Sequence, residues 1–273
     1  MIGDLKDSRI GECPMIEQLD LSLAIVTYNN AGIIEDTVKS IINNITSEYK
    51  YKLYIIDNNS SDKTIEIVKK IKGNIEIIDL KVNKGFGYGH NAILKNLNSK
   101  YHLVVNPDIS IEDDKQIKKM IQFMDENEDV GMMSPLIVNP ELTIQYLCKI
   151  NPTVFDMLIR RVSPKLFPKR QDRYVMKDTN YKKTMNIEYA SGCFMFFRTD
   201  IFKKIKGFDD NFFMYLEDAD ITRRVNESSE AVFFPEARVI HAWERGSHSS
   251  FKLAIITVKS MIIYFRKWGL RIF

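Results

Sequence analysis

The chain has few cysteines, no long apolar run and little excess charge of either sign. Its 273 residues include three cysteines, none of them in the C-x-x-C spacing of a zinc or redox site. Because an odd number of dispersed cysteines does not suit a disulfide framework, we expect a reducing cytosol as the compartment. No segment has the uninterrupted apolar length of a membrane span. The charged opening residues 1–7 likewise do not match a secretory signal peptide.

Basic side chains are concentrated in one part of the chain. The formal net charge is only +3, too small for the basic coat of nucleic-acid-binding proteins, so we expect no nucleic-acid partner. Between residues 160 and 183, however, nine basic residues accompany two acidic ones, which leaves a local charge of +7. We call residues 160–183 the basic segment. It needs water, an anionic ligand or an anionic membrane surface beside it.

Apolar runs alternate with helical patterns in the first half of the chain. Four runs predict buried strands at residues 21–27, 52–56, 75–80 and 101–105. The segments between them predict helices at 34–45, at 62–71 and from about residue 90. A helix at 112–127 and a strand at 130–133 follow. Strands that alternate with helices form parallel βαβ units, so the sequence predicts an α/β fold with a mostly parallel central sheet flanked by helices.

The second half of the chain is less regular. Prolines interrupt the pattern from 135 to 183, where we expect short strands and a mobile excursion that faces a substrate. Later elements are predicted as a strand at 187–197, a helix from 199, a short helix at 217–226, short strands at 231–234 and 238–241, and a closing helix at 250–268. Residues 1–20 show no period and predict a loose arm.

Two acidic residues follow predicted strands of the parallel sheet, where ligands of open α/β sheets bind. Asp57 is a candidate acceptor for the N–H of a nucleotide base or for ribose hydroxyls, although a turn that caps the next helix is the commoner use of such a residue. Asp108 follows Asn106 and Pro107, and the proline prevents the strand from continuing. Asp108 is a candidate ligand for Mg²⁺ or Mn²⁺ beside phosphate oxygens. A plain proline turn is the alternative.

Residues 83–91 carry three glycines at alternate positions, Gly85, Gly87 and Gly89. Glycine allows a ligand to approach the backbone closely, and Lys84 supplies positive charge near the start of a helix. The spacing is not the dinucleotide pattern G-x-G-x-x-G and does not follow the first strand, which removes the main support for a dehydrogenase. A flexible loop is the alternative.

A second acidic cluster, at residues 217–220, begins a predicted helix. Asp218 is a candidate general base for a hydroxyl nucleophile, whereas acidic residues in a first helical turn are often present for capping alone. His241 ends a predicted strand and is a candidate metal ligand or phosphate donor, with Trp243 and His248 close by in sequence. Lone histidines are more often structural.

The closing helix carries Lys252, Lys259 and Arg266 at heptad spacing on an otherwise mostly apolar surface. Such a helix packs against its domain or lies at an anionic membrane surface with the basic stripe toward the headgroups. Because the basic segment is a second cationic feature, we keep peripheral contact with an anionic inner membrane as an expectation.

The order and spacing of these motifs resemble the family 2 glycosyltransferases, in particular the bacterial rhamnosyltransferase-like branch that builds surface polysaccharides. The motifs lie at residues 25–29, 56–62, 83–87 with Asn91, 106–108, 190–193, 207–210 and 213–220. The resemblance implies a GT-A fold, a cytoplasmic nucleotide-sugar donor, a divalent cation, Mg²⁺ or Mn²⁺, and inversion at the anomeric carbon. Its usual Asp-x-Asp is here Asn-Pro-Asp, so a single carboxylate remains for the metal.

The resemblance assigns roles to individual positions. Residues expected at the donor are Thr27, Tyr28, Asn29, Asp57, Lys84, Gly85, Asn91, Asn106 and Asp108. Asp108 would also hold the metal, with His241 completing its shell, and Asp218 would be the catalytic base. Residues expected at the acceptor are Gly192, Glu217 and Trp243. The donor is expected to be a dTDP- or UDP-sugar, with rhamnose favoured, and the acceptor a lipid-linked oligosaccharide in O-antigen or capsule synthesis.

The same resemblance divides the chain into four parts. They are an arm at 1–20, a nucleotide-sugar-binding half at 21–134, an acceptor-binding and catalytic half of the same domain at 135–248, and a C-terminal amphipathic helix at 249–273. A sugar-nucleotide pyrophosphorylase is one rival, but it needs a glycine-rich phosphate loop where residues 27–30 provide none. A non-catalytic nucleotide-sugar-binding scaffold is the other, and it would be favoured if Asp108 and Asp218 opened onto different surfaces.

Overall fold

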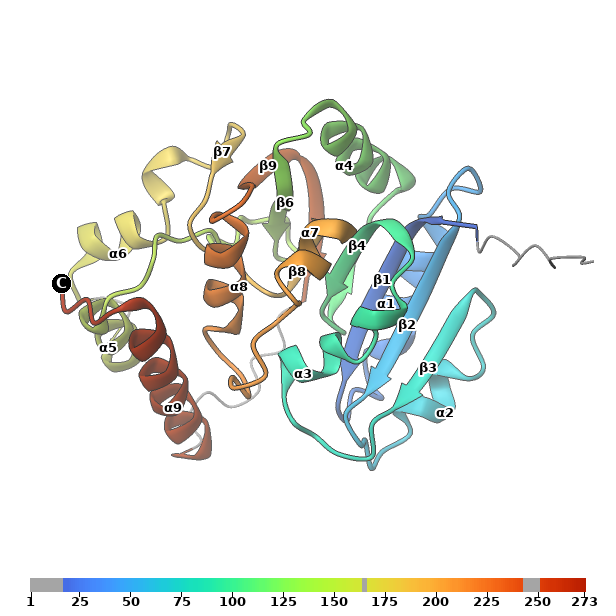
Figure 1. Cartoon of the computed structure of the whole chain (residues 1–273), viewed down its shortest axis with the longest axis horizontal. Helices are drawn as coiled ribbons and strands as arrows, with labels where there is room; N and C mark the ends of the chain where they lie inside the picture. The colour runs from blue at the N-terminus through green and yellow to red at the C-terminus, as the bar shows by residue number, and fades with distance from the viewer. Residues whose placement is uncertain (1–16, 164–165, 243–250) are drawn as a thin grey trace, which may run out of the picture.

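The computed structural model describes residues 17–163, 166–242 and 251–273, and within them nine strands form one sheet (Figure 1). The strands are β1 Leu19–Thr27, β2 Tyr51–Asp57, β3 Ile75–Asp79, β4 Ser99–Val105, β5 Ile109–Ser110, β6 Val130–Val138, β7 Met185–Asn186, β8 Phe194–Arg198 and β9 Glu230–His241. Their order is β3-β2-β1-β4-β8-β6-β9-β5, and β7 pairs with β9. The helices are α1 Ile34–Asn43, α2 Thr64–Val68, α3 Phe86–Asn91, α4 Asp114–Glu126, α5 Val154–Val162, α6 Pro168–Tyr174, α7 Thr199–Lys204, α8 Glu217–Val225 and α9 Phe251–Trp268.

The first half of the sheet is parallel, as predicted, because helical crossovers connect its strands. β1 pairs in parallel with β2 and with β4, and β2 pairs in parallel with β3. The register places Thr27 opposite Asp57, and Ile25 opposite Val105. The carboxyl ends of β1, β2 and β4 therefore share one edge of the sheet, and the predicted ligand-binding corners emerge from that edge.

The second half of the sheet is mixed. β8 runs antiparallel to both β4 and β6, whereas β9 runs parallel to β6 and antiparallel to the short β5. The pairing of β5 with β9 places Ile109 opposite His241. The residues that follow β4 are thus brought beside the end of β9, although more than a hundred residues separate them in sequence.

Several predicted boundaries in the structure are wrong for local reasons. The helix expected from about residue 90 already begins at Phe86, because Gly85 turns the chain with a φ of 104°. β6 continues through Pro135, where a register shift against β9 tolerates the missing N–H. Opposite this register shift, the two short strands expected at 231–234 and 238–241 form one continuous strand, β9.

Helices replace the short strands expected between residues 135 and 183. Thr153 caps α5 by accepting a hydrogen bond from Asp156 N, and Pro168 occupies the first turn of α6, where its missing N–H costs nothing. The strand expected at 187–197 is confined to β8, Phe194–Arg198. The preceding residues 190–193 instead form a loop that faces α8, and this loop becomes important at the candidate site.

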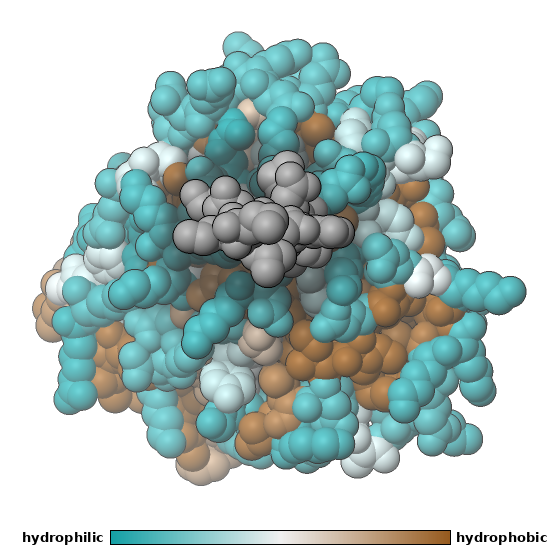
Figure 2. Space-filling model, turned by 45° about the vertical axis from the view of Figure 1, so that its right-hand side comes forward, coloured by the Kyte–Doolittle hydropathy of each residue, from teal (hydrophilic) through white to brown (hydrophobic). Residues whose placement is uncertain are grey.

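Helix α9 packs at one end of the molecule, near α5 and α8 (Figure 1). Tyr264 and Phe265 are buried against Phe212 and Leu216, and Ser260 Oγ donates a hydrogen bond to the carbonyl oxygen of Met214 over 2.8 Å. Packing against the domain, one of the two expected placements of this helix, is therefore confirmed for its inner face. Figure 2 shows another side of the molecule, where hydrophilic surface surrounds several apolar patches.

Two histidines are buried in the core. Burial lowers the pKa of His90 well below its usual value and that of His102 to about 3. His102 Nδ1 lies 2.8 Å from Ser22 Oγ, whereas neither ring nitrogen of His90 has a hydrogen-bond partner within the described residues. Both rings are therefore neutral in the folded protein at neutral pH.

We expect these histidines to make the protein less stable in mild acid. Below about pH 6.5 the histidines of the unfolded chain bind protons, whereas the buried rings of the folded protein do not. For each of the two histidines, the free energy of unfolding therefore falls by about 1.4 kcal/mol for every unit by which the pH is lowered. His90→Phe keeps the aromatic contacts with Phe86 and Phe208 and should remove one histidine's share of that slope. Denaturant unfolding of the unmodified protein and of His90→Phe at pH 7 and pH 5 measures how the free energy of unfolding changes with pH. An equal change in both proteins would contradict a neutral, buried His90.

Candidate active site

Asp108 lies at the corner after β4, beside the end of β9. Its carbonyl oxygen accepts a hydrogen bond from Ala242 N over 3.0 Å. Its Oδ2 atom lies 3.2 Å from His241 Nε2, and the two side chains are only 13% and 8% exposed. The structure thus brings together the two residues that were expected to hold a metal.

The surroundings of this pair suit a cation. Gln145 Nε2 donates to the carbonyl oxygen of His241 and Gln145 Oε1 lies 2.8 Å from His241 Nδ1, so Nδ1 carries the ring proton. In the neutral ring, the Nε2 lone pair then faces a carboxylate oxygen, and a positive charge between them relieves the repulsion. Asp108 Oδ1 is also buried and has no hydrogen-bond partner among the described residues.

The pair fits a divalent ion that shares its coordination with a ligand. Among the described residues no group of three or more His, Cys, Asp or Glu side chains could hold a metal. Mg²⁺ and Mn²⁺ accept one or two protein ligands when phosphate oxygens and water complete the shell. The single carboxylate of the Asn-Pro-Asp corner is therefore sufficient if a diphosphate supplies the other oxygens.

Asp218 stands in the first turn of α8. Gly192 N donates to Asp218 Oδ2 over 3.2 Å, and Ala219 N donates to Oδ1 over 3.0 Å. Since the side chain stays partly exposed, it can accept a proton from a bound molecule.

One loop, residues 190–193, connects the two carboxylates. The carbonyl oxygen of Cys193 accepts a hydrogen bond from Asn106 N over 2.9 Å, two residues before Asp108, and Gly192 contacts Asp218. Burial raises the pKa of the Cys193 thiol, and the negative charges of Asp108 and Asp218 raise it further. The loop 190–193 is therefore hydrogen-bonded at its two ends to the Asp108 corner and to Asp218.

Further titratable groups surround Asp218. Glu217 is buried, and burial together with the charge of Asp218 raises its pKa well above the usual value. Burial lowers the pKa of Lys149, and the nearby Asp218 opposes that shift. The Lys149 ammonium lies 4.1 Å from the centroid of the Tyr189 ring. Sequence reasoning missed Lys149, because a lone lysine in an irregular segment gives no signal.

A cleft of about 840 Å³, which we call the donor cleft, opens at the carboxyl edge of the parallel strands. From the first half it is lined by Val26, Thr27, Tyr28, Asn30, Asn58, Asn83, Gly85 and Phe86. Helix α9 covers the opposite side and contributes Lys252 and Lys259. The volume suits a nucleotide-sized ligand. Two residues of the basic stripe thus face this cleft, a placement that the sequence did not predict.

Two glycines allow close packing between the donor cleft and the Asp218 corner. At Gly85 a Cβ atom would lie 2.0 Å from the carbonyl oxygen of Phe213, and at Gly192 it would lie 3.3 Å from the Phe86 ring and 3.4 Å from Asp218 Cβ. Phe86 lines the donor cleft, and Phe86 and Asp218 both lie next to Gly192. The motifs at 83–87, 190–193 and 213–220 consequently meet in one place.

The predicted donor residues divide into two groups. Thr27, Tyr28 and Gly85 line the donor cleft, and their contact with a donor stays a prediction. Asp57 lies at the same edge, but both of its carboxylate oxygens accept a hydrogen bond from Ser60 N, so the turn that was the alternative is present. The neighbouring Asn58 lines the cleft, and its buried Oδ1 has no hydrogen-bond partner within the described part of the chain.

The remaining donor candidates have structural contacts. Asn29 Oδ1 accepts from Ser61 N over 2.8 Å, and Lys84 Nζ lies 4.7 Å from the Tyr88 ring centroid. Asn91 Nδ2 donates to the carbonyl oxygen of Phe208 over 2.7 Å and its Oδ1 accepts from Phe208 N over 2.9 Å. Contacts of these residues with a donor stay predictions. Trp243 and His248 lie outside the described residues.

Solved structures share this fold at low sequence identity. A mannosyltransferase from Pyrobaculum calidifontis, PcManGT, solved with GDP-Man and Mn²⁺, matches 93% of this chain and 65% of its own with a TM-score of 0.65 and 15% identity. GalNAc-T7, solved with UDP, GalNAc and Mn²⁺, matches 92% of this chain and 48% of its own with a TM-score of 0.66 and 14% identity. The expected GT-A glycosyltransferase fold is thereby confirmed.

The chain belongs to glycosyl transferase family 2, whose model matches residues 22–206. A model described as the N-terminal domain of galactosyltransferase also matches residues 173–248. Curated relatives include an N-acetylglucosaminyl-diphospho-decaprenol L-rhamnosyltransferase of Mycobacterium tuberculosis, 21% identical over 81% of this chain and 75% of its own. The rhamnosyltransferase WbbL of Escherichia coli is 24% identical over 81% of this chain and 84% of its own.

Proposed function

We propose that the protein is an inverting glycosyltransferase that moves a sugar, with rhamnose favoured, from a dTDP- or UDP-sugar to a hydroxyl of a lipid-linked oligosaccharide. The relatives are named as rhamnosyltransferases, one of them for a lipid diphosphate acceptor, and a role in O-antigen or capsule synthesis follows from that similarity. One observation carries the proposal: the loop 190–193 joins the Asp108 corner to the Asp218 corner beside the donor cleft.

The reaction is a single displacement. The acceptor oxygen forms a bond to the anomeric carbon as the bond from that carbon to the diphosphate breaks, and Asp218 takes the proton of the attacking hydroxyl. Burial and the charge of Asp218 raise the pKa of Glu217 well above its usual value, so we infer that Asp218 is the basic member of this cluster. Because the single Asp218 carboxylate attacks no carbon itself, the transferred sugar is inverted.

The leaving diphosphate needs positive charge. Asp108 and His241 would hold Mg²⁺ or Mn²⁺, which supplies electrostatic stabilisation of the departing oxygens when bound. Lys252 and Lys259 line the donor cleft and add two ammonium groups of this chain. The division into a nucleotide-sugar-binding half at 21–134 and an acceptor-binding half at 135–248 stays part of the proposal, with α9 contributing to the first site.

Donor binding is the simplest test of this function. A nucleotide sugar at about 100 times its Kd should stabilise the folded protein by about 2.7 kcal/mol, because only the folded state binds it. We expect UDP- or dTDP-sugars to raise the Tm in Mg²⁺ or Mn²⁺ and to act more weakly in EDTA. A fluorescence thermal scan with a panel of nucleotide sugars measures this, with ATP as a control nucleotide. Stabilisation by no member of the panel would contradict the proposal.

The rival enzyme and the scaffold fit the structure less well. A pyrophosphorylase needs a glycine-rich loop after β1, and the loop there is Tyr28-Asn29-Asn30, closed by hydrogen bonds of Asn30 Oδ1 to Thr27 and Tyr28. A scaffold has no need for two carboxylates that meet at one loop.

Peripheral contact with an anionic membrane remains part of the proposal. No helix within the described residues is long and apolar enough to cross a membrane. On α9, however, Phe251, Ile255, Val258 and Ile262 are exposed at the spacing of one helix face. We expect sedimentation with phosphatidylglycerol vesicles at low salt, loss of binding at high salt, and no binding to phosphatidylcholine vesicles. Equal behaviour with both lipids would exclude the electrostatic part of this contact.

A further inference from the structure

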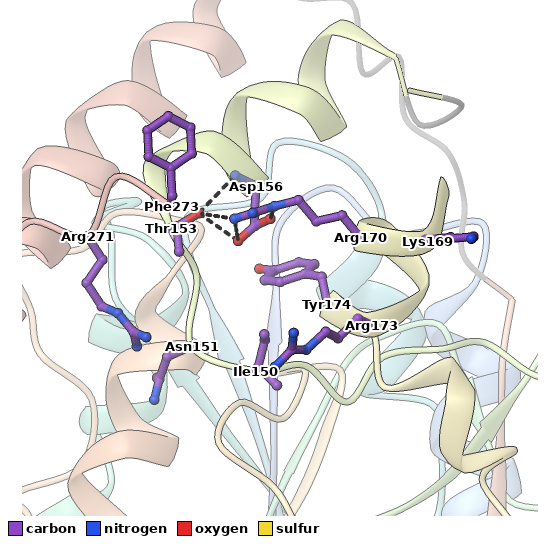
Figure 3. Close-up of a pocket in the computed structure, with 10 residues that line it drawn as sticks. All are labelled: Ile150, Asn151, Thr153, Asp156, Lys169, Arg170, Arg173, Tyr174, Arg271 and Phe273. Carbon is purple, nitrogen blue, oxygen red and sulfur yellow. Dashed lines mark hydrogen bonds and ion pairs between the residues drawn. The ribbon is translucent and has the colours of Figure 1, made fainter. Parts of the chain in front are cut away.

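A second cavity, of about 500 Å³, lies outside the donor cleft, between α5, α6 and the residues that follow α9 (Figure 3). We call it the basic pocket. Its cationic side chains are Lys169, Arg170, Arg173 and Arg271, and its one carboxylate is Asp156. Three of the cations belong to the basic segment and the fourth is about a hundred residues away in sequence, so the fold gathers positive charge here.

The carboxylate does not neutralise the whole pocket. Arg170 Nε donates to Asp156 Oδ1 over 2.6 Å, and Arg170 Nη2 donates to Asp156 Oδ2 over 3.2 Å. This bidentate ion pair with Arg170 neutralises the negative charge of Asp156. Within the described ranges, Arg173 and Arg271 have no carboxylate at ion-pairing distance. Figure 3 shows Arg271 directed toward Asn151 and Arg173 directed toward Ile150, whereas Lys169 points away.

Tyr174 adds an uncommitted hydroxyl to the same space. The residue is only 3% exposed, and Figure 3 shows its ring between Arg170 and Arg173 with the hydroxyl directed into the pocket. Its hydroxyl has no hydrogen-bond partner among the residues that the structure describes. Burial raises the pKa of Tyr174, and the charge of Asp218 raises it further. The phenol therefore keeps its proton and can donate a hydrogen bond to an anionic ligand.

An apolar rim borders this positive pocket. The Phe155 ring centroid lies 5.5 Å from that of Phe167 and 5.2 Å from that of Phe273. Phe167 is 57% and Phe273 76% exposed. Exposed aromatic side chains beside an anion site favour a ligand that carries both a polyanion and an apolar chain.

We propose that the basic pocket binds the diphosphate group of the lipid-linked acceptor, with its apolar chain on the rim formed by Phe167 and Phe273. The inference rests on the proposed glycosyl transfer. Lys149 belongs to the cluster around Asp218, and the next two residues, Ile150 and Asn151, line the pocket. The proposal therefore places the first sugar of the acceptor between Asp218 and the basic pocket.

Farnesyl diphosphate and inorganic diphosphate are suitable probes, because they separate the lipid from the anion. Binding is measured by titration calorimetry with the donor cleft saturated by UDP and Mg²⁺, so that only the second site is read. The test variant is Arg173→Gln with Arg271→Gln. The matched control, Lys182→Gln with Lys183→Gln, removes the same charge from exposed positions of the same basic segment outside the pocket.

We expect the test variant to bind farnesyl diphosphate about tenfold to a hundredfold more weakly, since it loses two charge-assisted contacts. The control variant should stay within about twofold. Inorganic diphosphate should bind the unmodified protein more weakly than farnesyl diphosphate does. An equal loss of affinity for farnesyl diphosphate in both variants would contradict diphosphate binding in the basic pocket. Equal affinity of the unmodified protein for the two probes would contradict the contact between the apolar chain and the rim.

Enzyme kinetics separate this inference from the proposed function. If the protein transfers sugar, the test variant should raise the KM for the lipid-linked acceptor at least about tenfold and leave the KM for the donor unchanged. An unchanged acceptor KM would overturn the pocket while transfer itself stands. If no transfer is found with any donor, the proposed function fails, and the calorimetric comparison still decides whether the pocket binds a prenyl diphosphate.

Discussion

Replacing Asp218 with asparagine is expected to lower kcat for sugar transfer by about 10²- to 10⁴-fold, the usual contribution of a general base. Asparagine keeps the size of the side chain and can still accept one of the two hydrogen bonds from Gly192 N and Ala219 N, although its NH2 group cannot accept the other. The donor cleft is lined by other residues, so the affinity for the nucleotide should not change. Initial rates at saturating donor, together with donor calorimetry, measure the two quantities separately.

Glu217→Gln is the matched control for Asp218→Asn. Both substitutions exchange a carboxyl for an amide at adjacent positions, but Glu217 is buried, and burial with the charge of Asp218 raises its pKa well above the usual value. Glutamine is a neutral side chain of the same size, so kcat should stay within a few-fold. The raised pKa also costs stability above the unfolded pKa, where only the unfolded chain ionises, and Glu217→Gln should therefore stabilise the protein increasingly as pH rises. Retained turnover in Asp218→Asn would remove Asp218 from the role of base.

Asp220→Ala is expected to lower the free energy of unfolding by about 3–5 kcal/mol, because it leaves the mostly buried Arg224 guanidinium without its counter-charge. Asp220 is fully buried. Its Oδ2 accepts from Arg224 Nε over 2.8 Å, and its Oδ1 accepts from Trp268 Nε1 and lies 2.8 Å from Lys267 Nζ. The same carboxylate therefore holds α9 against α8, and its loss should also loosen the wall of the donor cleft.

Denaturant unfolding monitored by far-UV circular dichroism measures this loss. The control is Asp172→Ala, which removes an ion pair to Lys177 whose side chains are 51% and 48% exposed. Such a surface pair contributes at most about 1 kcal/mol. A loss for Asp220→Ala no larger than that of Asp172→Ala would show that the buried network does not fasten α9.

The parallel half of the fold was predictable because its signals are local. Apolar runs of strand length recur with helical patterns between them, and Pro107 ends β4 where a ligand corner was expected. The Asp218 corner was predictable as a helix start for the same reason. The sequence does not show, however, which acidic residue of the cluster 217–220 remains accessible. Burial assigns Glu217 and Asp220 to the interior and leaves Asp218 as the candidate base.

Features that depend on long-range packing were not predictable. The placement of Lys252 and Lys259 in the donor cleft depends on where α9 docks, and the helix pattern specifies only that one face is apolar. Arg173 and Arg271 share a pocket because the backbone after α9 pairs with the start of α5, through Val154 N and the carbonyl oxygen of Arg271. Neither contact leaves a sequence pattern of its own.

The most direct test of a single catalytic site is a crystal structure of the protein with UDP and Mn²⁺, in which anomalous scattering locates the metal. We predict a manganese peak at coordination distance from Asp108 and His241, diphosphate in the donor cleft, and the Asp218 carboxylate facing the same space. The peak should be absent from Asp108→Asn crystals. A manganese site elsewhere, or an Asp218 side chain separated from the diphosphate by closed protein, would contradict the account.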